Sequence, residues 1–253
     1  MAKKPDPVDI AAQQRAREQV EVEQAFRGDD HLVVSYLGDE LLSTMDPDDR
    51  LRMLETSVLD RFNGPLVDAV IYELHVGSFT AGGGLRDVIE RLDPLVDLGV
   101  THLELMPVAQ FPGEHGWGYD GIFWSAVHHA YGGPAALVEL VDAAHARGLA
   151  VVLDVVFNHV GPTGDGVYEA FGPFFTDEHP TAWGPGINVD GPGSDVVRET
   201  IFQVAEWWVR DVGVDGLRVD ACHAIADASA RHVLAELTDR VRACHPGALL
   251  IAE

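Results

Sequence analysis

The sequence has few cysteines, few basic residues and no long apolar run, and each shortage excludes a class of protein. Its two cysteines, Cys222 and Cys244, are too few for a disulfide framework and lack metal-ligand spacing, so we expect reduced thiols. Lysine and arginine together number 17 against 41 acidic residues, which gives a formal net charge of −24. Because this charge repels phosphate backbones, nucleic acid is not an expected partner.

No apolar run approaches the ~20 residues that span a bilayer, so we expect no membrane partner. The first ten residues, MAKKPDPVDI, lack the apolar stretch of a secretory signal, which predicts a cytoplasmic protein. What the sequence does have is apolar content, 47% of 253 residues, which is enough for a large core.

Residues 1–66 have a helical pattern that differs from the rest of the chain. The stretch from Val8 to Phe26 is rich in Ala, Gln, Glu and Arg, and Asp46-Pro-Asp-Asp49 is typical of a helix cap and first turn. We therefore predict a small helical N-terminal segment without catalytic residues. The apolar residues predicted to pack it are Leu41, Leu42, Leu51, Leu54 and Val58.

From residue 67 onward, short β-rich runs alternate with helical stretches. Such repeated βα units bury both faces of a parallel sheet, so we predict an α/β domain over residues 67–253. The predicted strands are Val70–Val76, His102–Met106, Ala150–Phe157, Val214–Val219 and Ala248–Ala252. The predicted helices are Leu85–Leu98, Pro134–Arg147, Asp195–Val212 and Asp227–His245.

Two architectures fit this pattern, a doubly wound sheet and a (β/α)8 TIM barrel. The segment after the first strand, His75-Val-Gly-Ser-Phe-Thr80, lacks the G-x-G-x-x-G order of a dinucleotide fingerprint. Polar residues instead follow the third, fourth and fifth strands, where a barrel carries its active site. We therefore predict strands 1 to 5 of a partial (β/α)8 barrel, with a long functional insertion over residues 158–193.

Arg218 and Asp220 stand two apart on one predicted strand, so their side chains leave on the same face. A guanidinium that close keeps the carboxylate ionised, which suits an anionic nucleophile. A purely structural ion pair fits the spacing equally well.

Glu253 follows the next strand and has apolar neighbours, a setting in which a carboxyl can stay protonated and act as a general acid. Carboxyls on adjacent strands can reach the ~5 Å separation of a retaining glycosidase. The alternative is that Glu253 only closes the strand.

Further polar and aromatic residues lie near the predicted strand ends. Asp154 belongs to a buried strand and is expected to orient its neighbours, whereas Asn158 and His159 follow that strand and can reach a ligand hydroxyl. Trp117 and Tyr119 stand in a glycine-rich loop and either stack on sugar rings or pack on the barrel rim. No spacing indicates a metal site, and we expect neither a metal nor another cofactor.

Together these residues resemble the α-amylase superfamily of glycoside hydrolases. Three stretches carry the resemblance, each at a predicted strand end: Asp154-Val-Val-Phe-Asn-His159, Gly216-Leu-Arg-Val-Asp-Ala221 and Ile251-Ala-Glu253. The resemblance implies that Asp220 is the nucleophile, Glu253 the acid/base and Arg218 the residue that fixes the nucleophile. It also implies that Tyr119, Asn158, His159, His223 and Trp117 contact the sugar.

Within that superfamily, several motifs are similar to the maltooligosyltrehalose trehalohydrolase family, among them Tyr72–Thr80, Gly116–Gly121 and Phe171–Asp177. The implied substrate is a maltooligosyltrehalose, cleaved at the α-1,4 bond beside its trehalose end. Branching and debranching enzymes acting on α-1,4/1,6-glucans share parts of this set and stay an alternative.

Two departures from the family pattern lead to further expectations. The family carries an N-terminal β-sandwich, whereas residues 1–66 resemble a segment of LuxR-type, MalT-like regulators and contain no P-loop. The family barrel has eight strands, with a third carboxylate after the seventh, and only five are predicted here. We therefore expect an inactive fragment of such an enzyme, or, as an alternative, a non-catalytic maltooligosaccharide-binding regulator.

Overall fold

The computed structural model describes residues 69–162 and 164–253. The helical segment predicted over residues 1–66, with its apolar contacts and its likeness to regulators, lies outside the described residues and stays a prediction. The α/β unit begins at Val70 and extends to Glu253.

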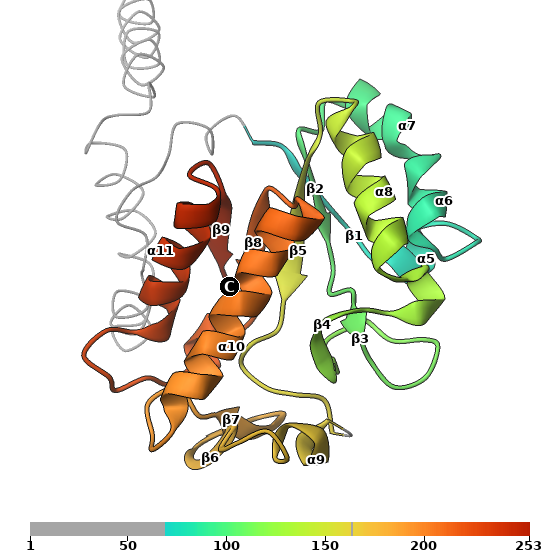
Figure 1. Cartoon of the computed structure of the whole chain (residues 1–253). Helices are drawn as coiled ribbons and strands as arrows, with labels where there is room; N and C mark the ends of the chain where they lie inside the picture. Colours follow the sequence, from blue (N-terminus) through green and yellow to red (C-terminus); the bar gives the residue numbers. More distant parts are fainter. Residues whose placement is uncertain (1–68, 163) are drawn as a thin grey trace, which may run out of the picture. The chain divides into compact units, whose positions relative to one another are not determined.

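The centre of this unit is a five-stranded parallel sheet (Figure 1). Its strands lie side by side in chain order, β1-β2-β5-β8-β9, with no reversal of direction along the sheet. A doubly wound fold needs such a reversal, whereas a barrel adds each strand beside the last. The prediction of a partial (β/α)8 barrel is therefore confirmed. The strands are β1 (Ile71–Leu74), β2 (His102–Leu105), β5 (Ala150–Val155), β8 (Gly216–Val219) and β9 (Leu249–Ala252).

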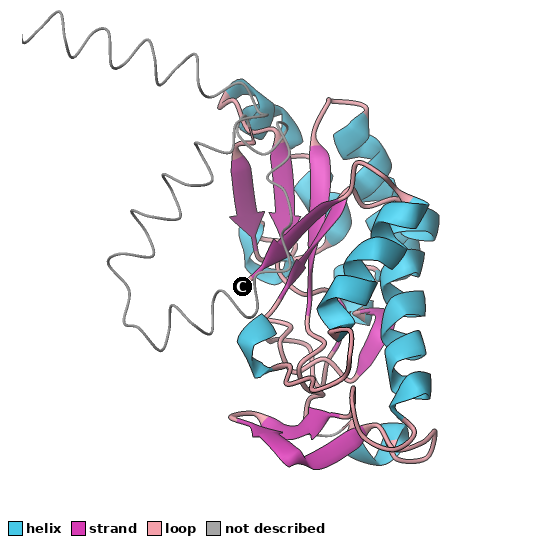
Figure 2. Cartoon of the chain, turned by 90° about the vertical axis from the view of Figure 1, so that its left-hand side faces the viewer, coloured by secondary structure: helices cyan, strands magenta, loops and turns pink. Residues whose placement is uncertain are grey.

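The two faces of the sheet differ because successive side chains of a strand alternate between them. One face carries fully buried Leu103, Leu153 and Leu217, and long helices pack against it (Figure 2). The opposite face carries polar groups, among them Asp154 and Arg218, which are direct partners in the β5–β8 register. The covering helices are α8 (Gly133–His145), α10 (Ser194–Trp207) and α11 (Val233–Cys244).

Two small antiparallel ribbons extend the unit beyond the barrel pattern, and neither was predicted. β3 (Ala109–Gln110) pairs with β4 (Phe123–Val127), and β6 (Phe175–Thr181) pairs with β7 (Gly184–Ile187). The β6–β7 hairpin and α9 (Asp165–Tyr168) belong to the predicted insertion and lie beyond the carboxyl ends of the strands (Figure 1). The remaining elements are α5 (Val76–Phe79), α6 (Leu85–Ile89), α7 (Leu92–Asp97), η1 (His129–Tyr131), the π-helical turn η2 (Trp208–Val212) and η3 (Cys222–Ala224).

The predicted single helix over Leu85–Leu98 is wrong, because the chain forms two short helices, α6 and α7, in its place. Pro94 explains the break: it has no N–H for the helical bond, and its ring would clash with the carbonyl of Glu90. The first strand also ends earlier than predicted, since Val76 already belongs to α5.

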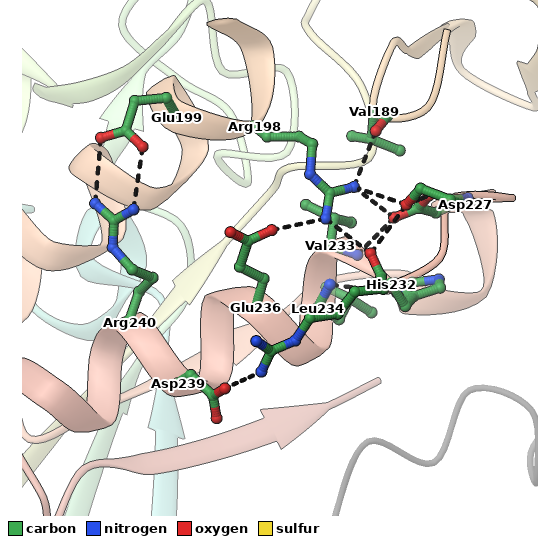
Figure 3. A network of polar contacts seen from close by, with 12 residues as sticks. Val189, Arg198, Glu199, Asp227, His232, Val233, Leu234, Glu236, Asp239 and Arg240 are labelled. Carbon is green, nitrogen blue, oxygen red and sulfur yellow. Dashed lines mark hydrogen bonds and ion pairs between the residues drawn. The ribbon is translucent and has the colours of Figure 1, made fainter. Parts of the chain in front are cut away.

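The predicted helix over Asp227–His245 is too long at its start: α11 begins six residues later, at Val233. Asp227 instead organises a loop: its fully buried carboxylate accepts hydrogen bonds from the backbone N–H groups of Ser229 and Val233. It also pairs with Arg198 of α10 at 2.8 Å (Figure 3). A side chain that bonds the local backbone in this way favours a turn over a helix.

Arg198 joins three parts of the chain through one nearly buried guanidinium. It donates to the Val189 carbonyl at the end of the insertion, to Asp227 in the loop, and to Glu236 of α11 (Figure 3). We expect Arg198→Met to destabilise the protein by about 3–5 kcal/mol, because it leaves the Asp227 carboxylate buried without its partner. Urea unfolding followed by circular dichroism measures this loss.

Arg240 supplies the matched control in the same view (Figure 3). It pairs with Glu199 and Glu206, but its side chain is 34% exposed, so the pairs are screened by water. Arg240→Met should cost less than about 1 kcal/mol. If both substitutions lowered the free energy of unfolding by the same amount, the role given to Arg198 would be contradicted.

Candidate active site

A single guanidinium, that of Arg218, lies among three carboxylates at the carboxyl ends of the strands. Its Nη1 donates to Asp154 Oδ2 at 2.7 Å and to Asp220 Oδ1 at 2.9 Å. Its Nη2 lies 3.3 Å from Glu253 Oε2. Burial opposes the charge of Arg218, but the neighbouring carboxylates outweigh it and raise its pKa above the ordinary value. Arg218 is therefore a fixed cation that contacts both Asp220 and Glu253, which the parallel β8–β9 register places at the same end of the sheet.

Asp220 is held from two sides. Besides Arg218 on Oδ1, Asn158 donates through Nδ2 to Asp220 Oδ2 at 2.9 Å and to the Asp220 carbonyl at 2.8 Å. The Asp220 side chain still has 14% of its surface exposed, so a ligand can reach it. Both oxygens are thus oriented and accessible.

His159 continues the series of hydrogen bonds from Asp220 through Asn158. Because Asn158 turns its amide group toward Asp220, its Oδ1 accepts from His159 Nδ1, which places the ring proton on Nδ1. Burial lowers the pKa of His159, so the ring is neutral near pH 7 and its Nε2 is an acceptor. The imidazole stacks on Trp183, with 5.4 Å between ring centroids and 24° between the planes.

Asp154 lies beside Tyr119 and beside Arg218, the cation partner of Asp220. Its side chain is fully buried, and Oδ2 accepts both from Arg218 and from the hydroxyl of Tyr119, at 3.0 Å. Oδ1 is buried and has no hydrogen-bond partner among the described residues. Burial raises the pKa of Asp154 to about 7, despite the opposing effect of Arg218. The same burial, together with Asp154, raises the pKa of Tyr119, which stays a hydrogen-bond donor.

The raised pKa of Asp154 predicts a pH dependence of stability. The folded protein holds a proton on Asp154 that the unfolded chain releases above about pH 4, so this contribution is present below pH 4 and is lost as the pH rises through 7. Its size is at most about 4 kcal/mol, at ~1.4 kcal/mol per pKa unit. Asp154→Asn should flatten the free energy of unfolding between pH 4 and 7, and an unchanged pH profile of that variant would contradict the assignment.

Glu253 lies in a more polar place than its apolar strand suggested. Its side chain is 54% exposed, and Oε2 accepts from the backbone N–H of Ala221 at 3.0 Å as well as pairing with Arg218. Ala221 itself adopts a left-handed backbone conformation, with φ of 43°. Within this chain the Glu253 carboxyl is thus half-exposed and hydrogen-bonded, and its acid/base role stays a prediction.

The two aromatic candidates of the glycine-rich loop differ in their surroundings. The Tyr119 hydroxyl donates to Asp154 and so contacts the group of side chains around Arg218. Trp117 is 73% exposed and does not pack on the barrel rim within the described structure. His223 is exposed on η3, directly after the Asp220 segment. Trp183 was not among the predicted sugar contacts; its ring is half-exposed and belongs to the β6–β7 hairpin, which was also not predicted.

Across residues 69–162 and 164–253, no three His, Cys, Asp or Glu side chains form a group that could hold a metal ion. In the same residues, every helix is too short or too polar to cross a membrane. What the site does contain is a reachable carboxylate, a second exposed carboxyl, a fixed cation and a neutral imidazole, a set suited to acid/base and nucleophilic chemistry on a neutral ligand.

Comparison with known proteins gives one family match. The model for the α-amylase catalytic domain matches residues 44–171. Among solved structures, a putative α-amylase from Salmonella typhimurium is similar, with a TM-score of 0.68 and 46% identity over 73% of this chain and 31% of that one. A type I pullulanase from Bacillus subtilis, solved in complex with maltose, has a TM-score of 0.66 and 28% identity, covering 74% and 31% of the two chains.

Curated relatives are also similar. Malto-oligosyltrehalose trehalohydrolase of Arthrobacter ramosus is 56% identical over 176 residues, which are 70% of this chain and 30% of the relative. The enzyme of that name from Saccharolobus solfataricus is 50% identical over 69% of this chain and 31% of its own length. The 1,4-α-glucan branching enzyme of Corynebacterium efficiens is 35% identical over 72% and 28%. The chain thus spans about three tenths of the length of these relatives.

Proposed function

The chain belongs to the α-amylase family, and from this membership we propose that it carries the nucleophile and acid/base of a retaining glycoside hydrolase acting on α-glucans. The observation that carries the proposal is the contact of Arg218 with Asp154, Asp220 and Glu253 at the carboxyl ends of β5, β8 and β9. Active sites of (β/α)8 barrels lie at this end.

The proposed reaction has two steps, and Asp220 and Glu253 take part in both. In the first, Asp220 attacks the anomeric carbon while Glu253 donates a proton to the glycosidic oxygen, so that a glycosyl ester forms and the leaving sugar departs with a hydroxyl. In the second, Glu253 takes a proton from water, which attacks the same carbon and releases Asp220. Arg218 and Asn158 orient the Asp220 carboxylate for this attack through their hydrogen bonds.

The residues around this pair supply the proposed sugar contacts. His159 Nε2 is available to accept a hydrogen bond from a sugar hydroxyl, since Nδ1 carries the ring proton. The half-exposed face of Trp183 and the exposed ring of Trp117 are proposed stacking surfaces for sugar rings. Tyr119 and His223 complete the proposed set.

Within the family, we propose that the substrate is a maltooligosyltrehalose, cleaved at the α-1,4 bond beside its trehalose end. Support comes from the identity of 56% and 50% to two trehalohydrolases against 35% to a branching enzyme. The second candidate is a non-catalytic maltooligosaccharide-binding protein, favoured by the regulator-like sequence of residues 1–66.

A chimaera separates these possibilities. Residues 70–253 would replace the matching segment of the Arthrobacter ramosus trehalohydrolase, and release of trehalose from maltotriosyltrehalose would be measured. We expect trehalose release within about tenfold of the parent enzyme, since this chain supplies the proposed nucleophile and acid/base and the parent supplies the strands and the third carboxylate that follow. A folded chimaera that binds the substrate without cleaving it would reject the hydrolase and support the binding protein. Cleavage of an α-glucan without trehalose release would support the branching or debranching type.

A further inference from the structure

The loop between β3 and β4 presents Trp117 and Tyr119, and the rest of the structure holds it firmly. Tyr119 is tied to Asp154 at one end of this loop. The backbone carbonyl of Gly116 directly precedes Trp117, and a Cβ atom on Gly116 would meet the Phe111 ring at 3.0 Å. The position of Gly116 therefore decides where the two aromatic side chains that follow it are placed.

His75, at the end of β1, is bound to that carbonyl. Its Nε2 lies 2.8 Å from the Gly116 oxygen, which can only accept, so Nε2 carries the proton. Nδ1 is then an acceptor, and the Ser78 hydroxyl lies 2.9 Å from it. The tautomer with its proton on Nε2 satisfies both contacts.

Tyr131 supports the same bond from the other side. Its hydroxyl lies 3.0 Å from His75 Nε2 and donates to the Gly116 oxygen at 3.3 Å, so that this carbonyl accepts twice. Gly77 permits the approach, because a Cβ there would meet both the His75 and Tyr131 rings at 3.1 Å.

A second imidazole holds the start of the loop. His128 Nε2 lies 3.1 Å from the Gly113 carbonyl, and its ring stacks on Phe111 with 3.8 Å between centroids. The loop is thus held at Gly113 and Gly116 by two imidazoles from outside it, while Trp117 stays exposed between these contacts and Tyr119.

We propose that His75 is a positioning residue for carbohydrate binding, which fixes the Gly116 carbonyl and through it the placement of Trp117 and Tyr119. The inference rests on the proposed function for its ligand, an α-glucan. His75 itself touches no reacting atom: it acts through the loop. A preorganised aromatic surface binds a sugar more tightly because less ordering is needed on binding.

Hydrogen exchange of the sugar-free 253-residue chain tests the placement directly. In His75→Phe, the amides of residues 113–122, among them the Ile122 N–H that donates to the Gln110 carbonyl, should exchange about tenfold faster, because Gly116 keeps only the bond from Tyr131. His75→Gln should restore most of the protection, since its side-chain amide stands the same number of bonds from the backbone as Nε2. Tyr131→Phe should give a smaller increase in the same residues.

His145→Phe is the matched control. This imidazole also makes a hydrogen bond, to Asp215 at 2.7 Å, but it lies at the amino ends of the strands. Exchange in residues 113–122 should be unchanged in this variant. The proposal would be overturned if the loop amides of His75→Phe exchanged at the wild-type rate. It would also be overturned if His75→Phe and His75→Gln raised the exchange rate equally.

Affinity for maltopentaose, measured by calorimetry on the same proteins, tests the consequence for binding. His75→Phe should weaken binding roughly 3- to 10-fold, as expected for one neutral hydrogen bond, and His75→Gln should recover it. If the loop amides of His75→Phe exchanged faster but its affinity for maltopentaose were unchanged, the role of His75 in carbohydrate binding would be overturned. Failure of the wild-type chain to bind maltopentaose would reject the α-glucan function, while the exchange experiment would still decide whether His75 positions the loop.

Discussion

Asp220→Asn in the chimaera is expected to lower the rate of trehalose release on the order of 10⁴- to 10⁶-fold, with no covalent intermediate formed. The amide oxygen is too weak a nucleophile to form the glycosyl ester. The rest of the site should survive, because Asn158 keeps its bond to the carbonyl of residue 220 when the side-chain acceptor is lost. Substrate affinity is therefore expected to stay within about threefold of wild type.

The control for this substitution is Asp190→Asn, which changes a carboxylate of the insertion that accepts from the backbone N–H of Ala228 and pairs with His179. It is expected to change the rate by less than tenfold. Calorimetry measures affinity, and a trehalose assay measures turnover. A rate for Asp220→Asn near that of the parent chimaera would reject Asp220 as the nucleophile.

Glu253→Gln should lower trehalose release about 10²- to 10⁴-fold, the usual contribution of a general acid. Glutamine keeps an oxygen that can accept from Ala221 and face Arg218, so the local contacts persist while the transferable proton is lost. The defect should therefore depend on the leaving group.

Maltosyl fluoride provides the test of that dependence, because fluoride leaves without protonation. Formation of the glycosyl-enzyme from this substrate should be slowed less than about tenfold by Glu253→Gln. An equally large defect with maltosyl fluoride and with maltotriosyltrehalose would contradict the acid role and indicate a general disruption of the site.

The sequence allowed much of the fold to be predicted because hydrophobic periodicity determines which face of each strand is buried. Leu103, Leu153 and Leu217 alternate with Glu104, Asp154 and Arg218, and the register places the members of each set on one face. The order of the strands in the sheet was predictable because short βα repeats place each strand beside the one before it. Helix boundaries were less predictable, because Pro94 and Asp227 act through local backbone geometry that periodicity does not contain.

The polar residues of the site were predictable for a related reason. Asp154, Asn158, Asp220 and Glu253 each stand at a strand end, and parallel strands bring such ends together. Trp183 could not be found in this way, because it reaches His159 from a hairpin 24 residues further along the chain. Nor did the sequence indicate that Arg218 would contact all three carboxylates, since this depends on side-chain conformations across β5, β8 and β9.

Covalent trapping tests the central claim, that Asp220 is the nucleophile of a retaining hydrolase, most directly. The chimaera would be incubated with 5-fluoro-α-glucosyl fluoride, whose ring fluorine slows both steps so that the glycosyl-enzyme accumulates, and its peptides would be analysed by mass spectrometry. We predict one glucosyl adduct on the peptide that contains Asp220, and none in Asp220→Asn. An adduct on Glu253 or on another residue, or turnover of the reagent with inversion and no adduct, would contradict the claim.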